Sequence, residues 1–143
     1  MVTEASDPFD LQRFVDAQNP VYATVLSELS AGQKRTHWMW FIFPQIGGLG
    51  SSAMSRRYAI SSLQEARVFL DHPILGARLR ETTRLVTVVK GRTVQQMLGS
   101  PDDMKFHSSM TLFAKASADD EIFRTALRTF FDGKSDAATL ARL

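Results

Sequence analysis

The chain has 143 residues, of which 44% are hydrophobic and 22% charged, with a formal net charge of +2. This balance predicts one folded domain over residues 1–143 and excludes a disordered chain, although we expect residues 1 to about 7 to be flexible. The absence of cysteine excludes disulfides, a cysteine nucleophile and thiolate metal sites, and fits a cytoplasmic location.

No membrane partner is expected, because no apolar run approaches the roughly 20 residues of a membrane span and the first residues do not resemble a signal peptide. Lysine and arginine are spread along the chain, with only short clusters such as Arg56-Arg57. Nucleic-acid-binding proteins usually concentrate these residues on one face. A nucleic acid is therefore not an indicated partner.

Helix signals follow one another along the chain, each combining a start signal with apolar residues at helical spacing. Asn19-Pro20 is typical of a helix start, Ser62 with Glu65 predicts a capping box, and Ser135 predicts the cap of a last short helix. The predicted helices cover residues 20–31, 62–70, 73–90, 93–98, 101–113, 119–131 and 135–143.

Two further segments, 37–43 and 85–89, have the length and residue types of strands. Two strands without a third partner make a poor sheet. We therefore predict buried helix for both, and an all-α fold of about six to eight helices in a single compact domain.

The aromatic and apolar block 37–43 ends at Pro44 and is followed by a loop rich in glycine and serine. A rigid apolar block beside a small polar loop is the composition of a pocket wall and its mouth. Trp38 and Trp40 would point in different directions on a helix, so one can pack in the core while the other lines a cavity.

Residues 48–53, GLGSSA, match a relaxed dinucleotide-binding fingerprint, but that fingerprint requires a parallel sheet, which this chain does not predict. The glycines would still let backbone N–H groups approach an anion, and the serines would add hydroxyl donors. The alternative is a tight connection whose serines cap the next helix.

Three side chains near this loop have both a functional and a structural explanation. His37 would act as a general base or pack with its ring hydrogen-bonded. Gln45 would face a pocket or cap a helix end. Tyr58 would stack on a ligand or belong to the core.

A second polar segment covers residues 102–111. Asp103 and His107 are four residues apart, but no further ligand accompanies them, so we expect no metal site. Lys105, Ser109 and Thr111 are polar residues within an otherwise apolar helix. They would face the Gly/Ser loop, or the hydroxyls would bond to the preceding turn of their own helix.

Four segments of the chain together resemble the bacterial domain-of-unknown-function family eighteen-ten. They are DPFDLQRFVDAQ, HWMWFIFPQIGGLGSSAMSRRYAI, HPILGARL and DDMKFHSSMTLFAKAS. The resemblance implies a compact all-helical fold but no established reaction. It also implies that the lysine at 105 is retained while a histidine at 107 is not required. The "calpastatin" label that members often carry is set aside, because calpastatin is a long disordered inhibitor.

The leading hypothesis is a domain that binds an anionic or nucleotide-like small molecule at the Gly/Ser-rich loop. The alternatives are a protein–protein interaction module without a small-molecule site and a small enzyme using His37 as general base. The sequence identifies no cofactor and leaves open whether the polar segments 36–60 and 102–113 meet in space. The predicted ligand-binding residues are His37, Gln45, Gly48, Gly50, Ser52, Ser55, Tyr58, Lys105 and Ser109.

Overall fold

The computed structural model describes residues 6–143, and within them it is helical without any named strand. The all-α prediction is confirmed. Six helices have seven or more residues and four have four or five, against the six to eight expected. They are α1 (Gln12–Gln18), α2 (Tyr22–Ser30), α3 (Met39–Ile42), α4 (Ala53–Arg57), α5 (Leu63–Asp71), α6 (Leu75–Val88), α7 (Val94–Leu98), α8 (Asp102–Ala116), α9 (Glu121–Phe131) and α10 (Ala137–Leu140).

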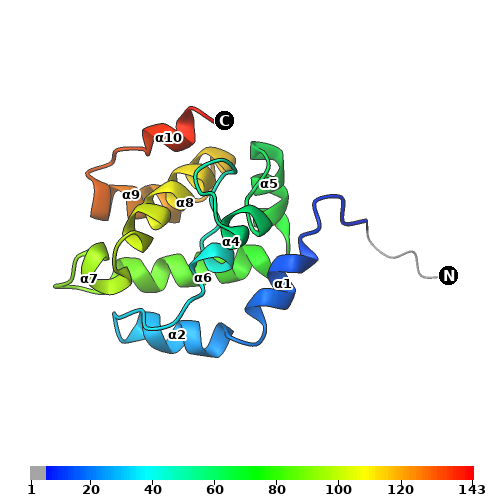
Figure 1. Cartoon of the computed structure of the whole chain (residues 1–143). Helices are drawn as coiled ribbons and strands as arrows, with labels where there is room; N and C mark the ends of the chain where they lie inside the picture. The colour runs from blue at the N-terminus through cyan, green and yellow to red at the C-terminus, as the bar shows by residue number, and fades with distance from the viewer. Residues whose placement is uncertain (1–5) are drawn as a thin grey trace.

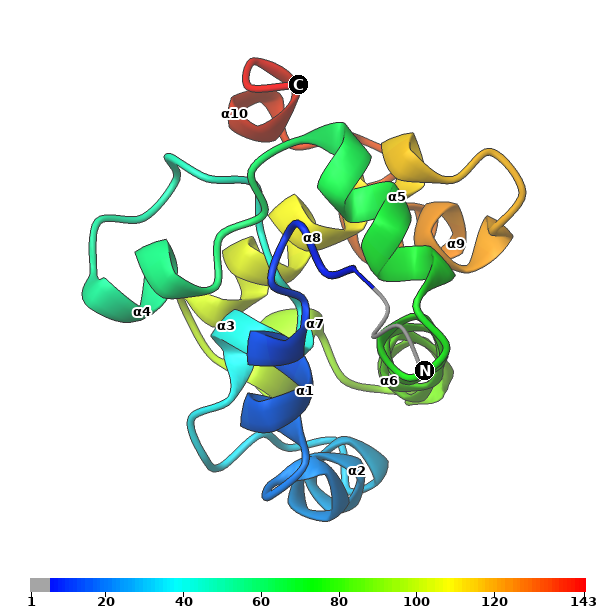
Figure 2. The same cartoon turned by 90° about the vertical axis from the view of Figure 1, so that its right-hand side faces the viewer.

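The two longest helices, α6 and α8, organise the molecule (Figure 1). Helices α5 and α9 each pack against both of them, while α2 covers the other side of α6, as the view along α6 shows (Figure 2). The short helices α7 and α10 pack against α8. Within residues 6–143, no helix is long and apolar enough to cross a membrane.

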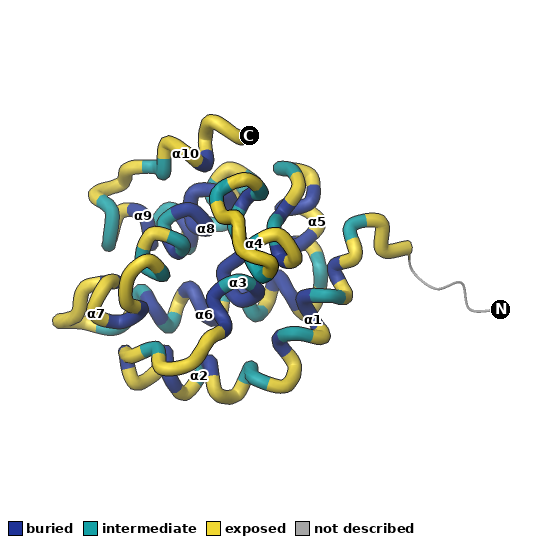
Figure 3. The backbone as a smooth tube through the Cα atoms, in the orientation of Figure 1, coloured by how far each residue is buried: buried dark blue, intermediate teal, exposed yellow. Residues whose placement is uncertain are grey.

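Aromatic side chains fill the centre, where buried residues concentrate along α3, α6 and α8 (Figure 3). Phe113 on α8 contacts Phe69 and Phe123, and Phe106, two turns earlier, contacts Phe43 edge-to-face at 5.0 Å between ring centroids. The middle of α8 is buried on every side, since residues 108–113 are all buried, whereas Met104 in its first turn is exposed.

Both segments that could have been strands contain helix, but the second is not buried as predicted, since Val88 is 58% exposed. Residues 85–88 form the last turn of α6, and the block 37–43 contains α3. Trp38 is buried in the core, and Trp40 is half-buried at the edge of two hollows. The prediction that one tryptophan packs in the core while the other lines a cavity is confirmed.

Helix starts follow the sequence signals in part. The Ser62 hydroxyl caps α5 by accepting a hydrogen bond from the Glu65 amide, but Glu65 does not complete a capping box. Its carboxylate instead accepts hydrogen bonds from Ser61 and pairs with Arg13 of α1 at 3.1 Å. Asp136, and not Ser135, caps α10.

The start expected at Asn19-Pro20 was wrong by two residues, because α2 begins at Tyr22 without a side-chain cap. Helix α1 was not predicted, and α4 was expected only in the alternative in which serines of the Gly/Ser-rich loop cap the next helix. Part of the expectation of a flexible N-terminus falls on residues 1–5, outside the described residues. Asp7 accepts hydrogen bonds from the amides of Leu11 and Gln12.

Candidate functional site

A groove lies where residues 34–58 meet the first turns of α8. It consists of two hollows, of about 310 and 350 Å³, which share Pro101 and Lys105 as lining residues. We name the first the lysine hollow, the second the apolar trough, and the pair the lysine groove. The two polar segments whose proximity the sequence left open therefore do meet.

Two lysines share one carboxylate in the lysine hollow. Lys34 Nζ lies 2.9 Å from Asp102 Oδ2, and Lys105 Nζ lies 3.5 Å from Asp102 Oδ1. This cluster of three keeps one net positive charge. Each ammonium group carries three N–H donors, so donors remain after the pairing with Asp102. The arrangement can hold carboxylate or phosphate oxygens.

The same two ammonium groups lie over the two tryptophan rings. Lys34 Nζ is 5.1 Å from the centroid of Trp38, and Lys105 Nζ is 5.2 Å from that of Trp40. These cation–π contacts orient the lysine side chains without consuming their hydrogen-bond donors in a second ion pair.

A buried carboxylate holds the turn that leads into the lysine hollow. Glu28 accepts hydrogen bonds from the amides of Arg35 and Thr36. It also accepts hydrogen bonds from the Thr36 hydroxyl and the Trp38 indole N–H. Burial alone would raise the pKa of Glu28, but these hydrogen bonds outweigh it and lower the pKa to about 2. Glu28 therefore stays ionised at neutral pH and fixes the turn that carries His37.

The Gly/Ser-rich loop is closed at its base by a parallel bridge between Ile46 and Ile60. The Gly47 amide donates to the Ile60 carbonyl, and the Ile60 amide donates to the Gln45 carbonyl, each at 2.8 Å. The loop and α4 therefore form one segment that is closed at residues 45–47 and at Ile60, and Gln45 lies where it begins.

The close contact between Gly50 and Ser55 within this segment requires a residue without a side chain at position 50. A Cβ atom at Gly50 would lie 2.6 Å from the Ser55 hydroxyl oxygen. Ser52 caps α4 by accepting a hydrogen bond from the Ser55 amide, and its hydroxyl donates to that of Ser55 at 2.9 Å. Ser52 thus has the structural role that was the alternative for these serines, whereas Gly50 and Ser55 line the trough.

The apolar trough takes its name from four side chains. Leu49 comes from the loop, Pro101 and Met104 from the start of α8, and Ala138 from α10. Met104 is 65% exposed. On the polar side of the trough, Ser108 and Asp136 are hydrogen-bonded to each other.

Seven of the nine residues predicted to bind a ligand line the groove or a hollow of about 10 Å³ beside it. The other two, Ser52 and Ser109, line neither. Ser109 is fully buried in α8, and its hydroxyl has no hydrogen-bond partner within residues 6–143. The seven lining residues are His37, Gln45, Gly48, Gly50, Ser55, Tyr58 and Lys105.

Tyr58 has the environment of a core tyrosine. It is 8% exposed, its ring packs against Phe14 and Phe41, and its hydroxyl accepts a hydrogen bond from Arg57 at 3.2 Å. The 10 Å³ hollow that it shares with Trp40 has room for about one water molecule. Of its two interpretations, the structural one describes this geometry.

His107 also has structural partners. Its ring stacks on Phe131 at 3.9 Å, and Nε2 lies 2.7 Å from the Lys134 carbonyl oxygen. Among the described residues, no group of three or more histidine, aspartate or glutamate side chains is arranged to hold a metal ion.

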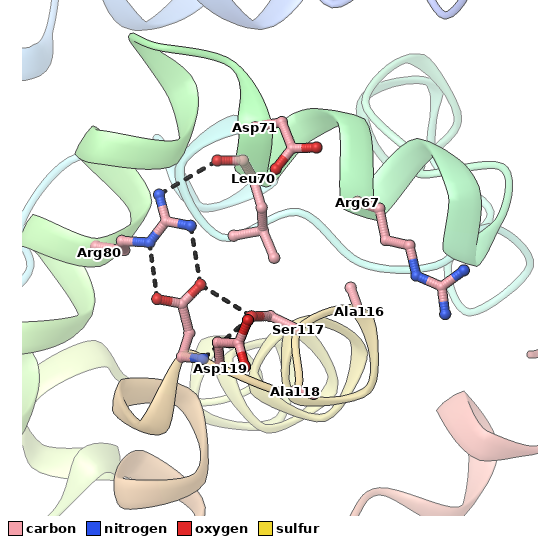
Figure 4. A pocket seen from close by; sticks show the side chains of 9 residues that line it. Arg67, Leu70, Asp71, Arg80, Ala116, Ser117, Ala118 and Asp119 are labelled. Atoms are coloured by element: carbon pink, nitrogen blue, oxygen red, sulfur yellow. Dashed lines mark hydrogen bonds and ion pairs between the residues drawn. The ribbon is translucent and has the colours of Figure 1, made fainter.

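A larger hollow of about 450 Å³, which we name the arginine hollow, lies between α5, α6 and the turn from α8 to α9 (Figure 4). Arg80 Nε and Nη2 donate to the two carboxylate oxygens of Asp120 at 3.1 and 2.8 Å, and Nη1 donates to the Leu70 carbonyl. Asp120 also accepts from Ser117. The hydrogen bonds from Arg80 lower the pKa of Asp120 against the opposing effect of burial.

The family model described as "Protein of unknown function (DUF1810)" matches residues 8–143. The chain belongs to this family. It is similar to the crystal structure of the conserved hypothetical protein Rv1873 from Mycobacterium tuberculosis, with 54% identity and a TM-score of 0.95 over 96% of this chain and 98% of that chain. A comparison with curated proteins gave no significant match. The family resemblance seen in the sequence is confirmed.

Sequence reasoning missed several parts of the groove in this DUF1810 protein. Lys34 and Asp102 are 68 positions apart, and nothing local indicates that they pair. Asp102 has an ordinary explanation as an acid at a helix start. Ala138 lies on a short C-terminal helix whose sequence gives no sign that it borders α8. The one available signal was a methionine, Met104, between the acids of a helix start and Lys105.

Proposed function

We propose that this protein binds an anionic small molecule in the lysine groove, in the cytoplasm, with Lys105 as its main charged contact. The observation that carries the proposal is that Lys34 and Lys105 share the single carboxylate of Asp102. A carboxylate or phosphate would accept charge-assisted hydrogen bonds from the ammonium donors that Asp102 leaves over.

Neighbouring polar groups support the same ligand class. Within residues 6–143 the Gln45 side chain makes no hydrogen bond, although it lines the trough beside Lys105. Lys105 is also more accessible than Lys34, with 23% against 7% of the side chain exposed. Lys105 and Gln45 would therefore contact the anion, and Lys34 would hold Asp102 in place.

Isothermal titration of the purified protein against phosphate, acetate and larger organic carboxylates and phosphates tests this proposal. We expect Lys105→Met to weaken binding by about tenfold or more, because a charge-assisted hydrogen bond is lost while the aliphatic stem stays. Lys115→Met is the matched control, since Lys115 is an exposed lysine on the same helix that lines none of these hollows. Equal binding by Lys105→Met and wild type would refute the role of Lys105.

If no anion binds the wild type, the proposal fails as a whole, and the protein-interaction module becomes the function to test. Capture experiments with Met104→Ser would then examine the exposed apolar side chain as an anchor for a protein partner.

An enzyme is the second candidate, because the exposed His37 lines the same hollow as Lys105. In that case His37 would act as a general base on a ligand held by Lys105. His37→Ala would then remove turnover of a bound ligand while leaving its affinity nearly unchanged. Unaltered turnover in His37→Ala would exclude this role.

A further inference from the structure

We infer that the ligand of the lysine groove is an amphiphilic anion, with a carboxylate or phosphate group at Lys105 and an aliphatic chain in the apolar trough. This inference rests on the proposed function and names the chemical class of the ligand. It differs from the nucleotide-like ligand that the sequence suggested.

The shape of the groove supports a ligand with two unlike ends. The lysine hollow and the apolar trough have Lys105 and Pro101 in common as lining residues, so the Lys105 side chain borders both. Met104 of α8 and Ala138 of α10 also line the trough. An anion with a chain attached would occupy the trough without losing its contact with Lys105.

The walls of the trough favour an aliphatic chain over a polar one. Leu49, Pro101, Met104 and Ala138 contribute apolar surface. The nearby acid, Asp136, already accepts hydrogen bonds from Ser108 and from the amide and hydroxyl of α10's Thr139. All three hydrogen bonds go to Oδ2, so Asp136 is a polar edge of the trough, and the aliphatic chain would lie along the four apolar side chains.

Met104 supplies an independent observation. At 65% it is the most exposed of the large hydrophobic side chains that are exposed within residues 6–143. A flexible thioether side chain adapts its shape to an apolar partner. A chain lying in the trough would cover Met104 and gain the free energy of burying apolar surface.

The aromatic rings beside the groove argue against a stacked base. Lys34 lies over Trp38 and Lys105 over Trp40, while the Tyr58 ring packs against core phenylalanines. The space between Trp40 and Tyr58 measures only about 10 Å³. A purine or pyrimidine would therefore have to displace a cation or a core ring before it could stack on any of these three side chains.

Titration calorimetry with a homologous series tests the inference: acetate, butanoate, hexanoate and octanoate, with octyl phosphate and adenosine monophosphate as further probes. We expect affinity to rise about threefold to fourfold for each added methylene until the trough is filled. Octanoate and octyl phosphate distinguish the two head groups.

Variants separate the two ends of the ligand. Met104→Ser should lower the gain in affinity per methylene, whereas Lys105→Met should weaken the binding of every member of the series. Val88→Ser is the matched control for Met104→Ser, because Val88 is 58% exposed on α6 and lines none of these hollows. Circular dichroism melting of each variant establishes that it is folded.

The outcomes distinguish this inference from the proposed function. Affinity that does not depend on chain length, or adenosine monophosphate binding more tightly than octanoate, would overturn the amphiphilic ligand and leave the anion site standing. No binding of any anion would overturn both. Octanoate binding that survives Lys105→Met unchanged would show partition into an apolar surface and would also overturn the inference.

Discussion

The arginine hollow and the lysine groove both place cationic side chains in a concave surface. They differ in how many N–H donors of Arg80, Lys34 and Lys105 remain outside internal hydrogen bonds and ion pairs. Arg80 donates from all three of its nitrogen atoms to Asp120 and to the Leu70 carbonyl. Lys34 and Lys105 instead share one carboxylate. The arginine hollow is the larger at about 450 Å³. Its Arg80 and Asp120 are paired with each other, whereas Arg67, Asp71 and Asp119 also line it and make no side-chain hydrogen bond or ion pair within residues 6–143 (Figure 4).

This contrast teaches that the volume of a hollow is a poor guide to binding in this protein. A guanidinium and a carboxylate that form a bidentate pair fix the geometry between helices and have little left for a ligand. An ammonium group that shares its partner keeps N–H donors that the partner does not occupy. We therefore expect the Arg80–Asp120 pair to serve stability, and we propose ligand binding for the lysine groove.

The largest expected effect is on the structural side of the contrast. A Cβ at Gly76 of α6 would lie 2.0 Å from the Leu70 carbonyl oxygen and 2.8 Å from Arg80 Nη1. Gly76→Ala should therefore lower the free energy of unfolding by about 3 kcal/mol, measured by urea denaturation. The higher helix propensity of alanine would by itself add about 1 kcal/mol, so a more stable variant would contradict the close approach.

Gly47→Ala is the matched control for that substitution. The nearest atoms to a Cβ at Gly47 lie at 3.6 Å, and its backbone is not left-handed. We expect its free energy of unfolding to stay within about 0.5 kcal/mol of wild type.

Glu28→Gln should have the next largest effect, about 2 kcal/mol, because a buried acceptor of four hydrogen bonds loses its charge. The folded pKa of about 2 lies below the ordinary value of 4.5. Ionised Glu28 therefore contributes stability above pH 4.5, and this contribution is lost as the pH falls toward 2. Urea denaturation between pH 7 and 2 should show the difference between wild type and variant narrowing below pH 4.5.

Glu28→Gln also tests whether ligand binding in the lysine groove depends on structural support, because Glu28 holds the turn that carries His37. Ligand affinity in the lysine groove should fall along with stability. A variant that lost stability but kept full affinity would show that the groove does not depend on this support.

Asp120→Asn should lower the free energy of unfolding by about 1 kcal/mol, since the pair with Arg80 is partly exposed. Calorimetric titration of the same variant should give wild-type affinity for any ligand of the lysine groove. Loss of ligand binding in Asp120→Asn would contradict a purely structural role for the Arg80–Asp120 pair.

Lys105→Met should have the smallest effect on stability, within about 0.5 kcal/mol, because its contact with Asp102 is long and partly exposed. Its effect on ligand affinity should be the largest of these variants. Urea denaturation and calorimetry on one preparation measure both quantities. A large loss of stability would assign Lys105 to the fold.

The sequence by itself determined the features that depend on neighbours along the chain. Helical periodicity and turn chemistry account for the Ser62 cap, the end of α2 before Gly32 and the burial of Trp38 beside a half-buried Trp40. These rules link residues within one or two helical turns, so the features that they determine can be predicted from neighbouring positions in the sequence.

Lys105 was also found from the sequence, because a lysine among apolar residues of a helix is conspicuous. Its neighbours in space were not. Glu28 and Trp38 lie ten positions apart, Lys34 and Asp102 lie 68 apart, and Gly48 accepts a hydrogen bond from Arg142 near the C-terminus. Only the tertiary structure decided which carboxylate each cation meets, because that choice depends on how the helices pack and not on local spacing. The same packing placed α10 beside Met104 and thereby gave the groove its apolar wall.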